Sequence, residues 1–143
     1  MDHNTQEKTI EKTQKKEINI KPYYLSKSSM QLRINKKERL KVGLHMNDYY
    51  YMCIALDKDL KRHLYLTKNK EKIEKNRYII YYEKKQLKRQ TKRALSISLQ
   101  ISSIFRKILK LGEIEKEARI IMLEPNKNLY THEIIFSSME RVP

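Results

Sequence analysis

"SMQLRINKKERLKVGL", residues 29–44, is the stretch from which we predict the fold. Its first part, "MQLRI", alternates strictly between apolar and polar residues, which is the period of a strand with one buried face. Met30, Leu32 and Ile34 fall on the apolar face. The sequence therefore predicts a half-buried strand that ends at Ile34.

The residues after this strand have the pattern of a short helix. Asn35 suits the N-cap position, and Glu38 three residues later completes an arrangement like the capping box. The helix "KKERLKV" would end at Gly43, because glycine readily adopts the left-handed conformation that closes many helices.

Residues 96–112, "SISLQISSIFRKILKLG", repeat this order of strand, short helix and glycine. The two copies align at four positions, the last of which requires an insertion of two residues: Ile34 with Ile101, Asn35 with Ser102, Arg39 with Arg106, and Gly43 with Gly112. A period near 67 residues is too long for a solenoid. It predicts two copies of a small unit that share one core as a single-chain pseudo-dimer.

Each glycine is followed by two apolar runs that favour a hairpin. In residues 49–66, "YYYMCIAL" and "HLYL" flank the turn-prone "DKD", although a helix from Asp48 to Leu66 stays open because both faces of the first run are apolar. In residues 118–136, "ARIIML" and "LYTHEIIF" flank a turn that contains Pro-Asn. The predicted class is α+β, with tandem strand–short helix–hairpin repeats that form one pseudo-dimeric barrel.

The charge of the chain points to its partner. The 143 residues carry 32 Lys and Arg against 17 Asp and Glu, a formal net charge of +15. Like charge at this density opposes folding unless a polyanion neutralises it. We therefore expect double-stranded DNA as the partner, with a homodimer or higher assembly forming on it.

The sequence lacks the patterns of an enzyme or of a membrane protein. Cys53 is the one cysteine, and the four histidines have no metal-ligand spacing. Without a Gly-rich phosphate loop or a nucleophile elbow, we expect no catalytic residue, no metal and no cofactor. No apolar run approaches the ~18 residues of a spanning helix, and the first residues lack the apolar run of a signal peptide. We expect a cytoplasmic protein, in the host cytoplasm if it is viral; the composition suggests an AT-rich archaeal or viral genome.

Several short motifs of the first copy occur together in one known family. They are Ser26, Lys27 and Ser28 in the turn before the strand, Ile34 and Lys36 at its end, and Arg39, Val42, Gly43, Leu44 and Asp48 in and after the helix. In these motifs the chain resembles the AbrB/MazE/SpoVT group of swapped-hairpin DNA-binding domains. It departs from that pattern at Asn35, where the family usually has Pro, and at Asn47, where it usually has Gly. The resemblance covers residues 20–66 and, less closely, 78–136, where Ile101, Arg106, Leu111 and Gly112 match.

The resemblance implies that the two copies interleave their strands and that basic residues on and around the short helices face DNA. Lys contacts phosphates as a point charge, whereas Arg and Gln can also read base edges in the major groove. A separate basic segment, "EKKQLKRQTKR" at residues 83–93, would place six basic residues on one face if it were helical. The candidate DNA-binding residues are Gln31, Arg33, Lys36, Lys37, Arg39, Lys41, Lys84, Lys85, Lys88, Arg89, Lys92, Arg93, Gln100, Arg106, Lys107 and Lys110.

The predicted organisation is a disordered basic and polar tail (1–19), a first DNA-binding repeat (20–66), a charged linker (67–77), and a second DNA-binding repeat (78–143) that contains the basic insertion 83–93. The predicted function is that of a transcriptional regulator with a sequence preference for double-stranded DNA.

Three other interpretations stay open. A tandem ribbon-helix-helix regulator of the archaeal-virus type would insert "QLR" and "SLQ" into the major groove as a two-stranded ribbon. It requires longer helices that pass through Gly43 and Gly112, and each mid-helix glycine costs about 1 kcal/mol. An antitoxin, or a nucleoid or capsid protein that coats DNA, is less favoured.

Overall fold

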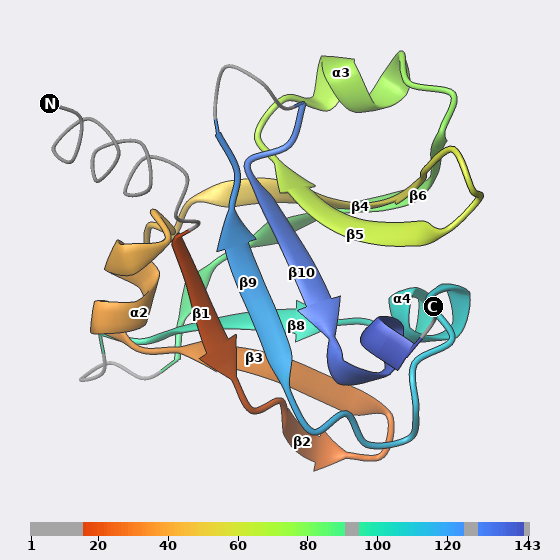
Figure 1. Cartoon of the computed structure of the whole chain (residues 1–143). Coiled ribbons are helices and arrows are strands. Elements are labelled where there is room, and N and C mark those ends of the chain that lie inside the picture. Colours follow the sequence, from red (N-terminus) through yellow and green to blue (C-terminus); the bar gives the residue numbers. More distant parts are fainter. Residues whose placement is uncertain (1–15, 91–94, 125–128, 142–143) are drawn as a thin grey trace, which may run out of the picture.

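The computed structural model describes residues 16–90, 95–124 and 129–141 (Figure 1). The strands are β1 (Lys16–Ile20), β2 (Tyr23–Ser26), β3 (Ser29–Ile34), β4 (Tyr49–Leu56), β5 (Arg62–Thr67), β6 (Ile79–Gln86), β7 (Lys88–Arg89), β8 (Ile97–Ile101), β9 (Ala118–Met122) and β10 (His132–Phe136). The helices are α2 (Lys36–Lys41), α3 (Lys70–Glu74), α4 (Ser103–Ile108) and the 3₁₀-helix η1 (Ser137–Arg141).

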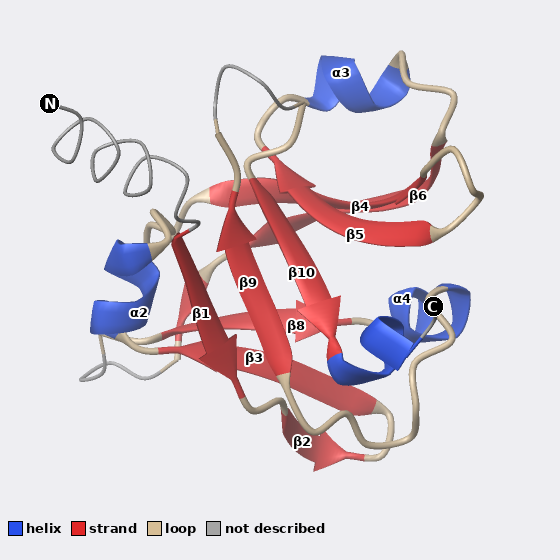
Figure 2. Ribbon diagram, viewed as in Figure 1, coloured by secondary structure: helices blue, strands red, loops and turns tan. Residues whose placement is uncertain are grey.

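The described residues form an α+β fold with two antiparallel sheets and short helices (Figure 2). One sheet has six strands in the order β1-β9-β10-β5-β4-β6, and the other has four in the order β2-β3-β8-β7. Both sheets are open, with β1 and β6 at the edges of the first and β2 and β7 at the edges of the second. The α+β class is confirmed, but the predicted closed barrel is wrong, because no hydrogen-bonded ladder in the described chain joins the edge strands.

The hydrophobic core lies between the two sheets, and β1, β9 and β10 run across β3 and β8 (Figure 1). The apolar face of the predicted strand supplies its centre: Met30, Leu32 and Ile34 are fully buried. Burial of these side chains and of their counterparts on β8 is the main favourable free-energy term that holds the sheets together, at ~25 cal/mol per Å² of apolar surface. The alternation predicted for both stretches is confirmed.

Strands β3 and β8 pair with a symmetric register. Leu32 lies opposite Leu99, with Met30 opposite Ile101 on one side and Ile34 opposite Ile97 on the other. Adding 67 to each number on β3 gives its equivalent on β8 (34 becomes 101, and 30 becomes 97), so the pairing maps onto itself about the Leu32–Leu99 pair. We call the pair of strands β3 and β8 the ribbon. Helices α2 and α4 follow these strands and therefore lie at opposite ends of the ribbon (Figure 1).

Helix α2 has the predicted caps. The Asn35 side chain accepts a hydrogen bond from the Glu38 N–H at 2.8 Å, and the Glu38 carboxylate accepts one from the Asn35 N–H at 3.1 Å. Gly43 then has φ 68°, in the left-handed region, and the Leu44 N–H donates to the Arg39 carbonyl at 2.8 Å. These bonds satisfy backbone groups that a helix end otherwise leaves unpaired.

Helix α4 ends in the same way but not at the predicted residue. Lys110, 67 positions after Gly43, has φ 55°, and the Leu111 N–H donates to the Arg106 carbonyl at 3.0 Å. The predicted match of Gly43 with Gly112 is therefore wrong, since the spacing of 67 needs no insertion here. Gly112 instead donates its N–H to the Glu115 carboxylate at 3.0 Å.

Both segments after the short helices are hairpins. Strand β4 pairs with β5, and β9 pairs with β10. The open possibility of a helix from Asp48 to Leu66 is therefore wrong. The ribbon-helix-helix alternative is wrong for the same reason, because that fold needs a second helix where this chain has the strands of these hairpins.

Three predicted boundaries also differ from the structure. The tail 1–19 overlaps β1, whose Ile18 and Ile20 are buried; residues 1–15 lie outside the described chain. The linker 67–77 contains α3, which buries Ile73. Residues 83–89 are in strands β6 and β7 and at their junction rather than in a helix, because β6 continues its ladder with β4 as far as Gln86.

The first strands of the two halves are exchanged. β1 pairs with β9, and β6 pairs with β4, so each adds to the hairpin of the other half.

The helices in the described ranges are all too short to span a membrane, and none has the hydrophobicity of a transmembrane segment.

Candidate nucleic-acid interface

The outer face of the four-stranded sheet carries two rows of polar side chains. In the first row Gln31 of β3 lies opposite Gln100 of β8. In the second row Arg33 lies opposite Ser98, which in turn lies opposite Lys88 of β7. Because their strand neighbours point into the core, these side chains must point away from it. The ribbon therefore presents amide, hydroxyl and cationic groups to solvent.

A groove of about 450 Å³ opens on this face. It is lined by Leu25, Gln31, Arg33, Lys84, Lys85, Gln86, Lys88, Arg89, Gln90, Ser98 and Gln100. Five of these residues are cationic and none is acidic, so the groove suits an anionic ligand. We call it the basic groove.

Arg33 is held in place at the centre of this face. Its guanidinium carbon lies 3.5 Å from the centre of the Tyr23 ring, and its Nε donates to the Gln31 side-chain oxygen at 3.4 Å. The Gln90 amide, with its oxygen turned toward Arg33, accepts from Nη1 at 3.0 Å and from Nε at 2.9 Å. Contact of a guanidinium with an aromatic face is favourable, and the surrounding bonds restrict its rotamers before any ligand binds.

The basic strands reach the groove because the chain crosses between the two sheets at Leu87. This side chain is fully buried between β6 and β7. Its N–H donates to the Asp48 carbonyl at 2.9 Å, and its carbonyl accepts from the Asn47 N–H at 2.7 Å. Asn47 has φ 67°, which asparagine tolerates better than most residues, so it can occupy a position where the resembled family usually has Gly.

The lysines of β6 differ in what surrounds them. Lys85 forms an ion pair with Glu83 at 3.0 Å. Hydrogen bonds from Tyr81, Lys85 and Ser102 outweigh the effect of burial and lower the pKa of Glu83, so it is a carboxylate at neutral pH. Lys84 is exposed, with its ammonium 4.6 Å from the centre of the Tyr49 ring. Lys84 and the exposed Lys88 are therefore the lysines best placed to meet a phosphate.

Two predicted DNA-binding arginines have structural partners instead. Arg39 is only 9% exposed, and its Nε donates to the Leu95 carbonyl at 3.0 Å. Arg106, 67 positions later, donates from Nη1 to the Lys27 carbonyl at 2.9 Å and from Nη2 to the Glu113 carbonyl at 3.3 Å. Each arginine thus fixes backbone just before the ribbon strand of the other half. The expectation that Arg39 and Arg106 face DNA does not fit these contacts.

Five further predicted lysines do not line the basic groove. Lys36, Lys37 and Lys41 are exposed on α2, and Lys107 and Lys110 are exposed on and after α4, at the other end of the ribbon. Lys92 and Arg93 lie outside the described residues. The structure thus brings together seven of the predicted residues around the groove: Gln31, Arg33, Lys84, Lys85, Lys88, Arg89 and Gln100.

Sequence reasoning missed the groove residues Gln86 and Gln90, and it did not connect Ser98 with them. The alternation of residues 96–101 already placed Ser98 outward. The signal for Gln86 and Gln90 was Leu87, the one apolar residue in this basic run. An isolated leucine there indicates that the chain is buried at that point.

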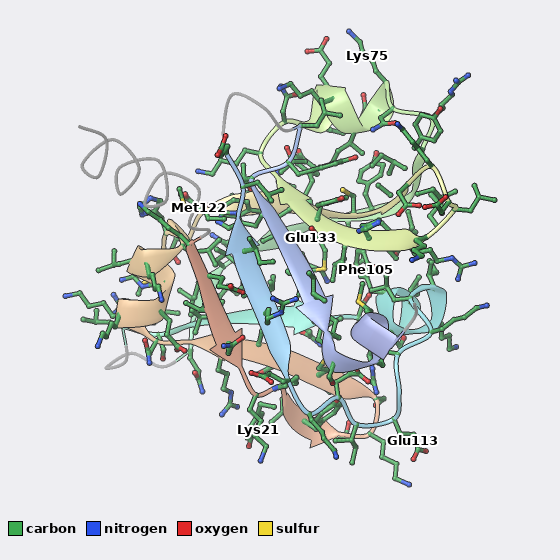
Figure 3. The ribbon with its side chains drawn as sticks, in the orientation of Figure 1. Lys21, Lys75, Phe105, Glu113, Met122 and Glu133 are labelled. Atoms are coloured by element: carbon green, nitrogen blue, oxygen red, sulfur yellow. The ribbon has the colours of Figure 1, made fainter. Side chains whose placement is uncertain are left out.

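A second charged cluster lies on the outer face of the six-stranded sheet. His63 has Asp57 at 2.8 Å from Nε2 and Glu133 (labelled in Figure 3) at 3.0 Å from Nδ1. The hydrogen bonds with Glu133 and Asp57 raise the pKa of His63 to about 9, although burial opposes this. The charged imidazole neutralises one of the two carboxylates, so the triad keeps a net negative charge and does not suit a polyanion. Among the described residues no group of His, Cys, Asp and Glu side chains is arranged to hold a metal ion.

The described geometry therefore offers one surface with the chemistry of a polyanion site, the basic groove on the outer face of the ribbon. Comparison of the chain with protein-family models, with curated proteins and with solved structures finds no match.

Proposed function

We propose that this protein is a double-stranded DNA-binding transcriptional regulator that recognises its site with the outer face of the β3–β8 ribbon. The observation that carries the proposal is the basic groove, in which the cations of β6 and β7 lie beside the outward glutamines of the ribbon. Antiparallel strands are known to read DNA in the major groove, which is wide enough to admit a two-stranded ribbon.

In this proposal the side chains around the groove have different roles. Lys84 and Lys88 neutralise phosphates, which gives affinity but no sequence information. Gln31 and Gln100 reach base edges, where a glutamine can bind adenine through two hydrogen bonds. Arg33, positioned by Tyr23 and Gln90, adds a guanidinium that can pair with guanine.

We further propose that the chain is a fused pair of AbrB/MazE/SpoVT-like swapped-hairpin units, in an open form rather than a closed barrel. The symmetric register about Leu32 and Leu99 supports this. Reversing the strand order while exchanging β1 to β5 for β6 to β10 also leaves both sheets unchanged. The exchanged strands β1 and β6 are the interleaved elements that such a pair requires.

The outward rows do not share this symmetry. The spacing of 67 makes Gln31 equivalent to Ser98 and Arg33 equivalent to Gln100. A symmetric frame therefore carries an asymmetric set of base-reading groups. The proposed operator is accordingly not a palindrome at the base pairs below the ribbon.

Fluorescence-anisotropy titration of a set of duplexes across a salt series tests the proposal. For the wild type, log K falls steeply with log salt, by about 0.9 for each phosphate contact. The variant Lys84→Ala/Lys88→Ala weakens binding to all duplexes and lowers this slope by about 2. The variant Gln31→Ala/Gln100→Ala keeps the slope but loses about 1–3 kcal/mol of preference for the best duplex for each glutamine removed.

A matched control removes the same charge elsewhere. Lys58 and Lys72 are exposed and do not line the groove, so Lys58→Ala/Lys72→Ala leaves the slope nearly unchanged. Equal losses in the two lysine pairs would reject the groove as the interface. Steep salt dependence without any preference among duplexes would indicate a DNA-coating protein, and salt-insensitive binding would remove DNA as the partner.

A further inference from the structure

Strand β6 is an edge strand with one unpaired side. Its other side forms a ladder with β4, from Tyr49 opposite Gln86 to Ala55 opposite Ile79. It is the last strand of the six-stranded sheet, and no described strand pairs with its free side. Eight residues of edge backbone offer a template on which another extended segment can add.

The side chains of residues 78–82 at the start of this edge are apolar or aromatic, whereas Glu83, Lys84 and Lys85 follow on the same strand. Tyr78, Ile80 and Tyr82 are 50%, 44% and 38% exposed, and no charged residue interrupts the run from 78 to 82. A hollow of about 550 Å³ lies beside them, lined in part by residues 79–82 and by Ile73 of α3. Edges that stay single are usually protected by charge, proline or shortness, and this part of β6 has none of these.

The opposite edge of the same sheet is protected. Strand β1 has five residues, and Lys16 and Asn19 on it are exposed, whereas Ile18 and Ile20 are buried. The two edges occupy equivalent places in the strand order. The two edges therefore differ in polarity. The edge of β6 is suited to pairing with another strand, whereas the edge of β1 is not.

We propose that β6 pairs antiparallel with β6 of a second copy of this chain, which joins two six-stranded sheets into one continuous sheet. The apolar run can pair with itself, and the register that we propose is centred on Tyr81. With Tyr81 opposite itself, Ile80 lies opposite Tyr82 of the partner subunit and Tyr82 opposite Ile80 of the partner subunit. Such aromatic and β-branched pairs stabilise antiparallel strands by roughly 0.2–1 kcal/mol each.

This register keeps the two copies of Lys84 apart, whereas Lys85 falls opposite Arg77 of the partner subunit at each end of the pairing. Lys84 comes opposite Tyr78 of the partner subunit, so it is six residues away from Lys84 of the partner subunit along the ladder. At ~3.4 Å for each residue the separation is about 20 Å. That is more than twice the Debye length of about 8 Å at physiological salt. The two copies of Lys84 therefore do not repel each other directly across the strand pair, and salt screens the net charge of +15 on each chain.

The occupant follows from this complementarity. A foreign strand would need no relation to the sequence of β6, whereas a second copy supplies the matching apolar pair twice in every contact. Lys84 on β6 also lines the basic groove. The proposal nevertheless does not depend on DNA binding, because the strand pair is formed by the edge backbone of β6 and the side chains of residues 78–82.

Sedimentation equilibrium of the full chain, freed of nucleic acid and held at 0.5 M salt, tests the proposal. The expected species has twice the 17.4 kDa mass of one chain. The variant Ile80→Lys/Tyr82→Lys places a lysine opposite a lysine in both pairs and weakens the dimer by about tenfold or more. The variant Ile80→Glu/Tyr82→Lys places unlike charges opposite one another in the same register and restores the dimer.

Asn19→Lys on β1 is the control for a lysine added to the other edge, and it leaves the dimer unchanged. Circular dichroism and thermal melting of each variant establish that the monomer still folds. A wild-type chain that stays monomeric at 100 μM overturns the proposal. So does equal weakening by the Lys/Lys and Glu/Lys variants, which would mean that Ile80 and Tyr82 do not face each other across a strand pair.

Discussion

Lys110 holds a backbone conformation that costs free energy for a residue with a side chain. Its φ of 55° matches the 68° of Gly43 at the equivalent helix end. A left-handed residue with a Cβ costs roughly 1–2 kcal/mol. The second half of the chain therefore carries a local strain that the first half avoids.

Exchanging these residue types tests that account. Lys110→Gly is expected to stabilise the protein by up to about 1 kcal/mol, because relief of the strain exceeds the loss of chain entropy. Gly43→Ala is expected to destabilise it by about 1–2 kcal/mol, and its Cβ would meet the Met122 sulfur at 3.4 Å. Urea unfolding measures both. A destabilising Lys110→Gly would mean that the Lys110 side chain contributes more than its backbone costs.

The His63 cluster makes stability depend on pH in a defined window. The hydrogen bonds with Glu133 and Asp57 raise the pKa of His63 from 6.5 to about 9, so the folded state holds its proton more tightly than the unfolded state does. The resulting stabilisation is complete below pH 6.5 and disappears as the pH rises through about 9.

His63→Gln removes this dependence. Urea unfolding is expected to show a larger stability difference between wild type and variant at pH 6 than at pH 10. Asp57 sets the lower limit of the pH range in which the cluster stabilises the fold. Its hydrogen bond with His63 lowers the pKa of Asp57, so the contribution of Asp57 to stability is lost only as the pH falls through that lowered value. A difference that grows with pH would contradict the assignment of a charged imidazole between the two carboxylates.

At the scale of elements, each short helix fixes the backbone that leads into the ribbon strand of the other half. Arg39 reaches from α2 to Leu95, which precedes β8, and Arg106 reaches from α4 to Lys27, which precedes β3. Removing a buried donor leaves a carbonyl without its partner, which costs about 1–3 kcal/mol. Both arginines are therefore expected to matter for stability more than for DNA.

Arg39→Ala separates the two roles. It is expected to lower the free energy of unfolding by about 1–3 kcal/mol. The slope of log K against log salt for DNA binding should stay that of the wild type, measured at a temperature where the variant is folded. A slope reduced by about 0.9 would instead assign Arg39 to a phosphate.

The elements that the sequence predicts well are those with a local signal. Alternation around Leu32 and Leu99 predicted both ribbon strands, and Asn35 predicted the start of α2. The errors fall where distant partners decide. Residues 83–86 form a strand because β4 lies beside them, and residues 16–20 do because β9 does. Neither partner is visible in a local pattern.

The candidate site follows the same rule. Gln31, Arg33 and Gln100 were predictable, because alternation alone fixes which face of a strand they occupy. Which cations join them was not, because the crossing at Leu87 determines where β7 lies. Arg39 matched a family motif, yet its burial depends on the other half of the chain.

At the scale of the whole molecule, the two halves are bound to each other through both sheets. β3 pairs with β8 in one sheet, and β5 pairs with β10 in the other. The exchanged strands β1 and β6 add a further pairing on each side. Neither half has a complete sheet or a covered core by itself, so we expect the described chain to unfold as one cooperative unit.

The pairing of β1 with β9 also affects how the chain folds during its synthesis. Ile18 lies opposite Ile120, so β1 has no partner strand until about a hundred more residues have been added. At ~5–20 residues per second that wait lasts roughly 5–20 s. During this interval the inward face of β3 is also not yet fully covered by the six-stranded sheet. The apolar faces of β1 and β3 are therefore exposed during this interval, and the two sheets can close only after β9 has been synthesised.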